Sequence, residues 1–129
     1  MSGEAATARI VLGLQGTVDY EIAWDSEVLE GLVAEHGIRE DELGTSAPVD
    51  DERSLVVALL GFLRAGTGGE RFVSSSDIVE RFAARFRTAV TLGGTSVRAA
   101  LVLRALGVPS LLHLVSLDDT VRRLLPADC

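Results

Sequence analysis

Residues 88–117, TAVTLGGTSVRAALVLRALGVPSLLHLVSL, contain a strand, a glycine turn, a helix and a second strand in succession. Thr88–Leu92 is rich in β-branched residues and predicts a strand. Val97–Leu106 predicts a helix that ends at Gly107, and Ser110–Leu117 predicts another apolar strand. A strand, helix and strand in this order indicate a parallel sheet with a right-handed crossover, and therefore an α/β fold.

The rest of the chain extends this pattern. Arg9–Leu14 is a short apolar run typical of a buried strand. Further helices with acidic residues at their N-terminal ends are predicted from Asp25 to His36, from Asp50 to Gly66, from Asp77 through Phe86, and from Asp118 to Leu125. Three strands are few for an open parallel sheet, so the remaining strands are expected in a longer parent sequence or in a partner chain.

Two connecting segments and two aromatic residues complete the predicted organisation. Residues 39–52 are acidic and rich in turn-forming residues, which predicts a loop, and residues 71–74 predict a short edge strand. Tyr20 and Trp24 are expected to pack the first helix against the sheet.

Composition restricts the classes of binding partner and the cellular compartment expected for this protein. A net charge of −7 over 129 residues disfavours nucleic acid and anionic membranes as partners. The longest apolar run, Leu55–Leu63, is far shorter than the roughly 20 residues that span a bilayer. The single cysteine, Cys129, suits a reducing compartment, so a cytoplasmic protein is expected. With only His36 and His113 besides, no metal-ligand cluster is predicted.

The first candidate site is the segment Gly13–Asp19, GLQGTVD, at the end of the first predicted strand. Open α/β sheets bind ligands beyond the carboxyl ends of their strands, and the Asp19 carboxylate can accept hydrogen bonds from two neighbouring sugar hydroxyls. The same residues also suit a simple turn in which the aspartate caps a backbone amide.

The second candidate site is Gly93-Gly94-Thr95-Ser96, between a strand and a helix. Glycines let the backbone approach a ligand closely, and a helix N-terminus favours hydroxyl oxygens or anions. The alternative is an ordinary turn with Thr95 or Ser96 as the helix N-cap.

Three single residues are further candidates for ligand contacts. Glu70 follows the glycine loop Gly66–Gly69 and is either a second carboxylate for sugar hydroxyls or a solvated loop charge. Arg98, one turn into the helix, is either an anion-binding residue or a surface arginine. His113 lies within an apolar strand and is interpreted as a core histidine in preference to a general base.

Three segments together resemble the ADP-dependent glucokinases and phosphofructokinases of the ribokinase-like superfamily. GLQGTVDYEI (13–22) resembles the family's first strand and its sugar-binding turn. LLGFLRAGTGGE (59–70) resembles the helix, glycine loop and glutamate that lead into the small lid domain. LGGTSVRAALVLRALGVPSLLHL (92–114) resembles the Gly-Gly turn, its helix and the following strand.

The resemblance implies a role for each matching residue. It implies that Asp19 and Glu70 bind sugar hydroxyls and that the Gly93 and Gly94 backbone touches the sugar. Thr17 stands where the family usually has asparagine, and Thr95 stands where glutamine is common. Both threonine side chains are shorter than the residues they replace, so the resemblance does not determine which sugar is bound. Arg98 can compensate by binding a phosphate, which would favour a phosphorylated sugar such as fructose 6-phosphate.

The resemblance implies a ribokinase-like parallel sheet with crossover helices, incomplete, and with residues 39–75 as a lid-related insertion. The complete enzyme would transfer a phosphoryl group from ADP to glucose or fructose 6-phosphate with Mg²⁺. The family's catalytic Gly-x-Gly-Asp segment is absent from this sequence, so the chain alone is expected to be inactive. The alternatives are a non-catalytic carbohydrate- or nucleoside-binding module, and an interaction domain that pairs through its sheet edge or self-associates.

Overall fold

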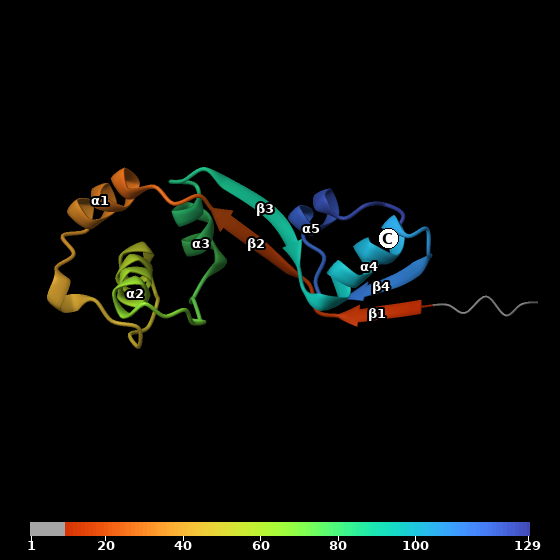
Figure 1. Ribbon diagram of the computed structural model, residues 1–129, viewed down its shortest axis with the longest axis horizontal. Coiled ribbons are helices and arrows are strands. Elements are labelled where there is room, and N and C mark those ends of the chain that lie inside the picture. The colour runs from red at the N-terminus through yellow and green to blue at the C-terminus, as the bar shows by residue number, and fades with distance from the viewer. Residues whose placement is uncertain (1–9) are drawn as a thin grey trace, which may run out of the picture. The chain divides into compact units, whose positions relative to one another are not determined.

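The computed structural model describes residues 10–129; Arg9, with which the first predicted strand begins, lies outside the described residues. The described residues form a mixed α/β structure with four strands and five α-helices (Figure 1). Contacts divide the chain into two compact units. The first unit contains the described residues up to Asp19 together with Val90–Cys129, and the second unit is Tyr20–Ala89.

The first unit contains the parallel strands that the sequence predicts. β1 (Ile10–Leu14) and β4 (Ser110–Leu114) pair in parallel, with Ile10 opposite Ser110 and Leu14 opposite Leu114. α4 (Thr95–Ala105) contacts both strands. The predicted combination of parallel strands and a covering helix is therefore confirmed for this pair.

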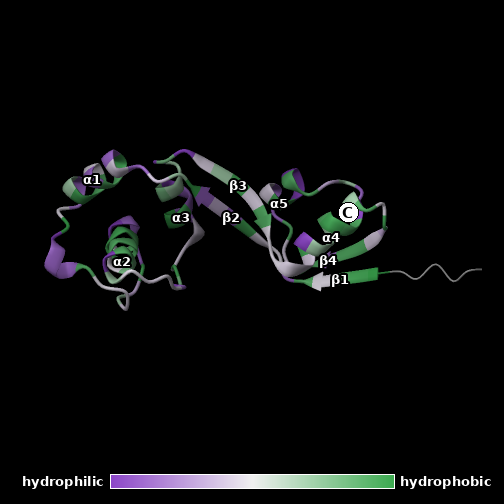
Figure 2. Cartoon of the chain, viewed as in Figure 1, coloured by the Kyte–Doolittle hydropathy of each residue, from purple (hydrophilic) through white to green (hydrophobic). Residues whose placement is uncertain are grey.

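One face of this strand pair packs on the core and the other is exposed. Side chains alternate between the faces of a strand, so Leu112 and Leu114 share one face of β4. These two leucines pack on the core residues Val97 of α4 and Val121 of α5 (Asp119–Leu124). Both strands are largely hydrophobic (Figure 2). A sheet of this composition normally has both faces covered.

The other two strands correct the prediction of a single parallel sheet. β2 (Thr17–Ile22) and β3 (Thr88–Gly93) form a separate two-stranded sheet. The strands run in opposite directions (Figure 1), since the amide of Ala23 donates to the Arg87 carbonyl at one end and Gly93 lies against Thr17 at the other. β2 was predicted as part of a turn.

The second unit is built mainly from helices. It contains α1 (Ser26–Glu35), the 3-10 helix η1 (Glu40–Glu42), α2 (Glu52–Ala65) and α3 (Ser76–Ala83). Their apolar faces meet in a core that includes the following side chains: Leu29, Leu32, Ile38, Val56, Val57, Phe82 and Phe86. α2 is hydrophobic along most of its length (Figure 2), as a helix packed by neighbours requires.

Several local predictions differ from the structure. The predicted edge strand at 71–74 is a single bridge between Val73 and Val49, and η1 lies inside the predicted loop 39–52. Trp24 is 65% exposed, so it is not the buried packing residue that was expected between α1 and the sheet. His113 is also exposed, because it lies on the uncovered face of β4, so its interpretation as a core residue was wrong. α3 ends before Phe86, although the Phe86 ring still packs on Phe82.

Candidate functional site

The first candidate site in the structure, the Asp19 corner, consists of Thr17, Asp19 and Arg98 in the first unit. Thr17 and Asp19 are two residues apart on β2 and therefore lie on the same face of the strand. The Thr17 hydroxyl donates a hydrogen bond of 2.9 Å to Oδ1 of Asp19. The second carboxylate oxygen faces α4, where Nη2 of Arg98 lies 3.4 Å from Oδ2.

Gly93 and Gly94 close this corner because their backbone lies directly against it. A Cβ at position 93 would overlap the Asp19 carboxylate and the Thr17 hydroxyl. Gly94 has φ of +92°, a region that side chains disfavour, and a Cβ there would lie 2.7 Å from the carbonyl oxygen of Gln15. The glycines therefore allow two distant segments of the chain, residues 15–19 and 93–94, to meet, which is a packing role.

A side-chain hydrogen bond also fixes the start of α4 to β1. Ser96 donates a hydrogen bond of 2.8 Å from Oγ to the Gly13 carbonyl. The N-cap of α4 is Gly94, and no side chain caps this end. The predicted alternative, in which Thr95 or Ser96 is the cap, is not what the structure shows: Thr95 is the first helical residue and is exposed.

Asp19 and Arg98 remain accessible to solvent. Their side chains are 37% and 65% exposed, and the contact between them is long for a charge-assisted hydrogen bond. An exposed pair of this kind contributes about 0–1 kcal/mol to stability. The corner therefore presents a carboxylate that can accept hydrogen bonds and a guanidinium with free donors.

The structure brings most of the predicted site residues together, namely Thr17, Asp19, Gly93, Gly94, Thr95 and Arg98. Glu70 belongs to the second unit, on the exposed segment that follows α2. Its participation in a site with Asp19 stays a prediction.

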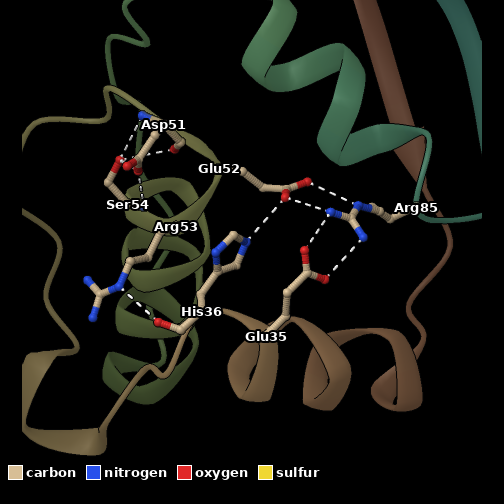
Figure 3. Close-up of polar contacts among 7 residues, drawn as sticks. All are labelled: Glu35, His36, Asp51, Glu52, Arg53, Ser54 and Arg85. Carbon is tan, nitrogen blue, oxygen red and sulfur yellow. Dashed lines mark hydrogen bonds and ion pairs between the residues drawn. The ribbon is translucent and has the colours of Figure 1, made fainter.

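Sequence reasoning missed a charged cluster in the second unit (Figure 3). Nε2 of His36 lies 3.2 Å from Oε2 of Glu52. The Arg85 guanidinium bonds Glu52 at 2.9 Å and Glu35 at 3.1 Å. These contacts join the end of α1, the beginning of α2 and the segment after α3. The only sequence signal was the adjacent pair Glu35-His36 at a helix end.

Arg85 shapes the electrostatics of this cluster. Its hydrogen bond and its positive charge lower the pKa of the Glu35 carboxyl below the ordinary value. One ligand atom from each of Glu35, His36 and Glu52 lies within 4.8 Å of the other two. An imidazole nitrogen and two carboxylates are a donor set that first-row divalent ions accept.

The second unit also contains apolar hollows. One of about 570 Å³ is lined mainly by apolar residues of α1 and its surroundings, among them Trp24, Leu29, Val33, Ile38 and Leu60. Another of about 360 Å³ lies between α2 and the glycine loop, and includes Phe62 and Gly69. Polar side chains also line these hollows: Ser26, Glu30 and Arg39 in the first, and Thr67 and Arg71 in the second.

Comparison with known proteins found no protein-family model that matches the chain and no curated protein that matches it. Among residues 10–129, no helix combines the length and the apolar character needed to cross a membrane.

Proposed function

We propose that the Asp19 corner is the sugar-hydroxyl site of a ribokinase-like, ADP-dependent sugar kinase. The observation that carries this proposal is the meeting of Asp19 with Gly93 and Arg98, residues more than seventy positions away in the sequence. The segments that meet are those whose resemblance to the family suggested a sugar site. An ionised carboxylate with an open side suits a pair of neighbouring hydroxyl donors.

The arrangement of the first unit supports the proposed fold. α4 covers one face of the parallel strands β1 and β4, and the opposite face remains apolar and exposed. In a ribokinase-like fold helices cover both faces of the sheet, so the proposal expects this face to be covered by helices as well. β2 and β3 connect the first unit to the second, which suits the proposed lid.

Magnesium does not fit the Asp19 corner. Oxygen ligands, usually one or two carboxylates together with several waters, surround this ion in proteins, and a neighbouring cation opposes its binding. The corner offers a single carboxylate, which already accepts from Thr17 and faces the cationic Arg98. The proposal therefore assigns the Asp19 corner to the sugar alone and places Mg²⁺ and ADP away from it.

Calorimetric titration of the chain with glucose and with fructose 6-phosphate tests the proposal. We expect Asp19→Asn to weaken the binding of either sugar by about tenfold or more, because a charge-assisted hydrogen bond is lost. Asp119→Asn, in the first turn of α5, is the matched control and should bind as the unchanged chain does. Failure of both sugars to bind, or equal binding by the Asp19 variant, would contradict the proposal.

A second candidate function is an interaction domain, which the uncovered face of β4 favours. Leu111 and Val115 on that face are 63% and 75% exposed. Binding of another chain there would bury apolar surface without any use of Asp19. The calorimetric titration separates the two candidates, since an interaction domain would bind neither sugar.

A further inference from the structure

The cluster of Glu35, His36 and Glu52 has distances suited to a metal ion. Metal–ligand bonds of about 2.1 Å place neighbouring ligand atoms of a tetrahedron roughly 3.4 Å apart. Nε2 of His36 and Oε2 of Glu52 are 3.2 Å apart, so they already have the required separation. Glu35 completes the set within 4.8 Å, and its exposed side chain can move the remaining distance.

Two of these ligands are held in place by the fold. The side chains of His36 and Glu52 are only 21% and 14% exposed, between the end of α1 and the beginning of α2. The carbonyl of His36 accepts a hydrogen bond of 3.1 Å from Nε of Arg53, which fixes the backbone from which the imidazole projects. Such support lowers the cost of ordering the ligands when a metal binds.

A cation already binds the two carboxylates of the cluster, on the side away from His36 (Figure 3). The Arg85 guanidinium donates to both carboxylates from the segment after α3 (Figure 3). Two carboxylates and one guanidinium leave a net negative charge when the imidazole is neutral. Arg85 is 41% exposed, so its long side chain can turn into solvent when a divalent ion takes its place.

We propose that Glu35, His36 and Glu52 form a binding site for a divalent transition-metal ion of the zinc class, for which the Arg85 guanidinium is the competing cation. One imidazole and two carboxylates supply three ligands, and water supplies the remainder. Metal binding keeps α1 and α2 joined and releases Arg85. The site is independent of the Asp19 corner.

Titration of the untagged chain with Co²⁺ and Zn²⁺ tests the site. Co²⁺ should give the visible absorption of a site with an imidazole ligand, at one ion per chain, and Zn²⁺ should displace it. We expect His36→Asn and Glu52→Gln to remove this binding. Glu27→Gln, an acidic residue in the first turn of α1, is the matched control and should leave it unchanged.

Substitution of Arg85 is the sharper test. If no cation competed with the metal for the carboxylates, the metal affinity would not depend on Arg85. Arg85→Gln should tighten Co²⁺ binding by about tenfold or more, since the metal no longer has to displace charge-assisted hydrogen bonds. Arg85→Lys keeps the charge and should bind Co²⁺ within a few-fold of the unchanged chain. Circular dichroism confirms that each variant is folded before titration.

Three results would overturn the proposal. One is the absence of a Co²⁺ spectrum in the folded chain at millimolar metal. Another is binding that His36→Asn leaves intact, and the third is an affinity that Arg85→Gln leaves unchanged or lowers. None of these results bears on sugar binding at Asp19.

Discussion

Gly61 and Gly31 show how one residue type has different consequences at two positions on neighbouring helices. Gly61 is buried in α2, and the backbone of Gly44 lies directly against it. A Cβ there would be 2.6 Å from the Gly44 carbonyl oxygen. Gly31 lies in α1 with open space around its missing side chain. Helix propensity alone would favour alanine at both positions.

We therefore expect Gly61→Ala and Gly31→Ala to change stability in opposite directions. Gly61→Ala should lower the free energy of unfolding by about 1–3 kcal/mol, because a clash with backbone costs more than propensity returns. Gly31→Ala should raise it by up to about 1 kcal/mol. Urea unfolding monitored by circular dichroism measures both changes; stabilisation by Gly61→Ala would show that the loop around Gly44 yields.

At the same scale, the sequence predicted some of the residues that meet in the structure and not others. Asp19, Gly93 and Gly94 were predictable because they belong to short glycine-containing motifs at strand ends. Glu35, His36, Glu52 and Arg85 belong to no motif. Their side chains meet only because α1, α2 and the segment after α3 pack together, and no local pattern in the sequence records that packing.

At the scale of the elements, α2 shows how reliably local chemistry predicts a helix. Asp51 is its N-cap, and the carboxylate accepts hydrogen bonds of 2.7 Å from both the amide and the hydroxyl of Ser54. Gly66 ends the helix in the left-handed conformation, with the amide of Thr67 bonded to the Phe62 carbonyl. The predicted bounds, Asp50 to Gly66, differ from the observed helix by only one or two residues.

Removal of this cap should destabilise the second unit. We expect Asp51→Ala to lower the free energy of unfolding at neutral pH by about 0.5–2 kcal/mol, while Asp51→Asn, which can still accept a hydrogen bond, should cost less. Chemical unfolding of the three proteins gives the comparison. An alanine variant as stable as the unchanged chain would mean that packing alone holds the start of α2.

The same residue predicts a dependence on pH. The hydrogen bonds from Ser54 lower the pKa of Asp51 below its ordinary value of 3.8. A lowered pKa stabilises the fold fully above the ordinary value, and this contribution is lost as pH falls through the lowered value. The stability of the unchanged chain relative to Asp51→Asn should therefore be constant near neutrality and fall below about pH 4. A constant difference down to about pH 2 would contradict the assignment.

β2 is the strand that the sequence analysis did not predict. Its sequence, Thr-Val-Asp-Tyr-Glu-Ile, alternates polar and apolar side chains, which is typical of an antiparallel strand with one covered face. The glycines that precede it favoured a turn instead. Its partner, β3, was predicted as a strand, but the direction of the pairing depends on residues seventy positions apart, which a local pattern does not contain.

At the scale of the whole molecule, the uncovered face of β1 and β4 is the feature with the largest consequence. Val11 is the register partner of Leu111, and both side chains are 63% exposed. Parallel strands with this composition are normally buried on both faces. Apolar side chains gathered on such a face favour association with another polypeptide.

We expect the isolated chain to self-associate with increasing concentration through this face. Leu111→Glu should weaken the association several-fold, because it would bury a charge without a partner. Val102→Glu, on the exposed side of α4, adds the same charge elsewhere and is the matched control. Sedimentation velocity over a range of concentrations measures the effect. A chain that is monomeric throughout, or variants that behave alike, would contradict the prediction.

The sequence by itself determined the helices, the N-caps Asp25, Asp51 and Asp118, and the two strands that pair in parallel, because these depend on periodicity and on residues within a turn of one another. It also predicted that Asp19, Gly93 and Gly94 come together, and Gly93 does lie against Asp19. Only the tertiary structure decided that β2 and β3 pair in opposite directions, that His113 is exposed, and that Arg85 joins Glu35 to Glu52. Those outcomes depend on which distant surfaces pack together, and that is set by the burial of side chains over the whole unit.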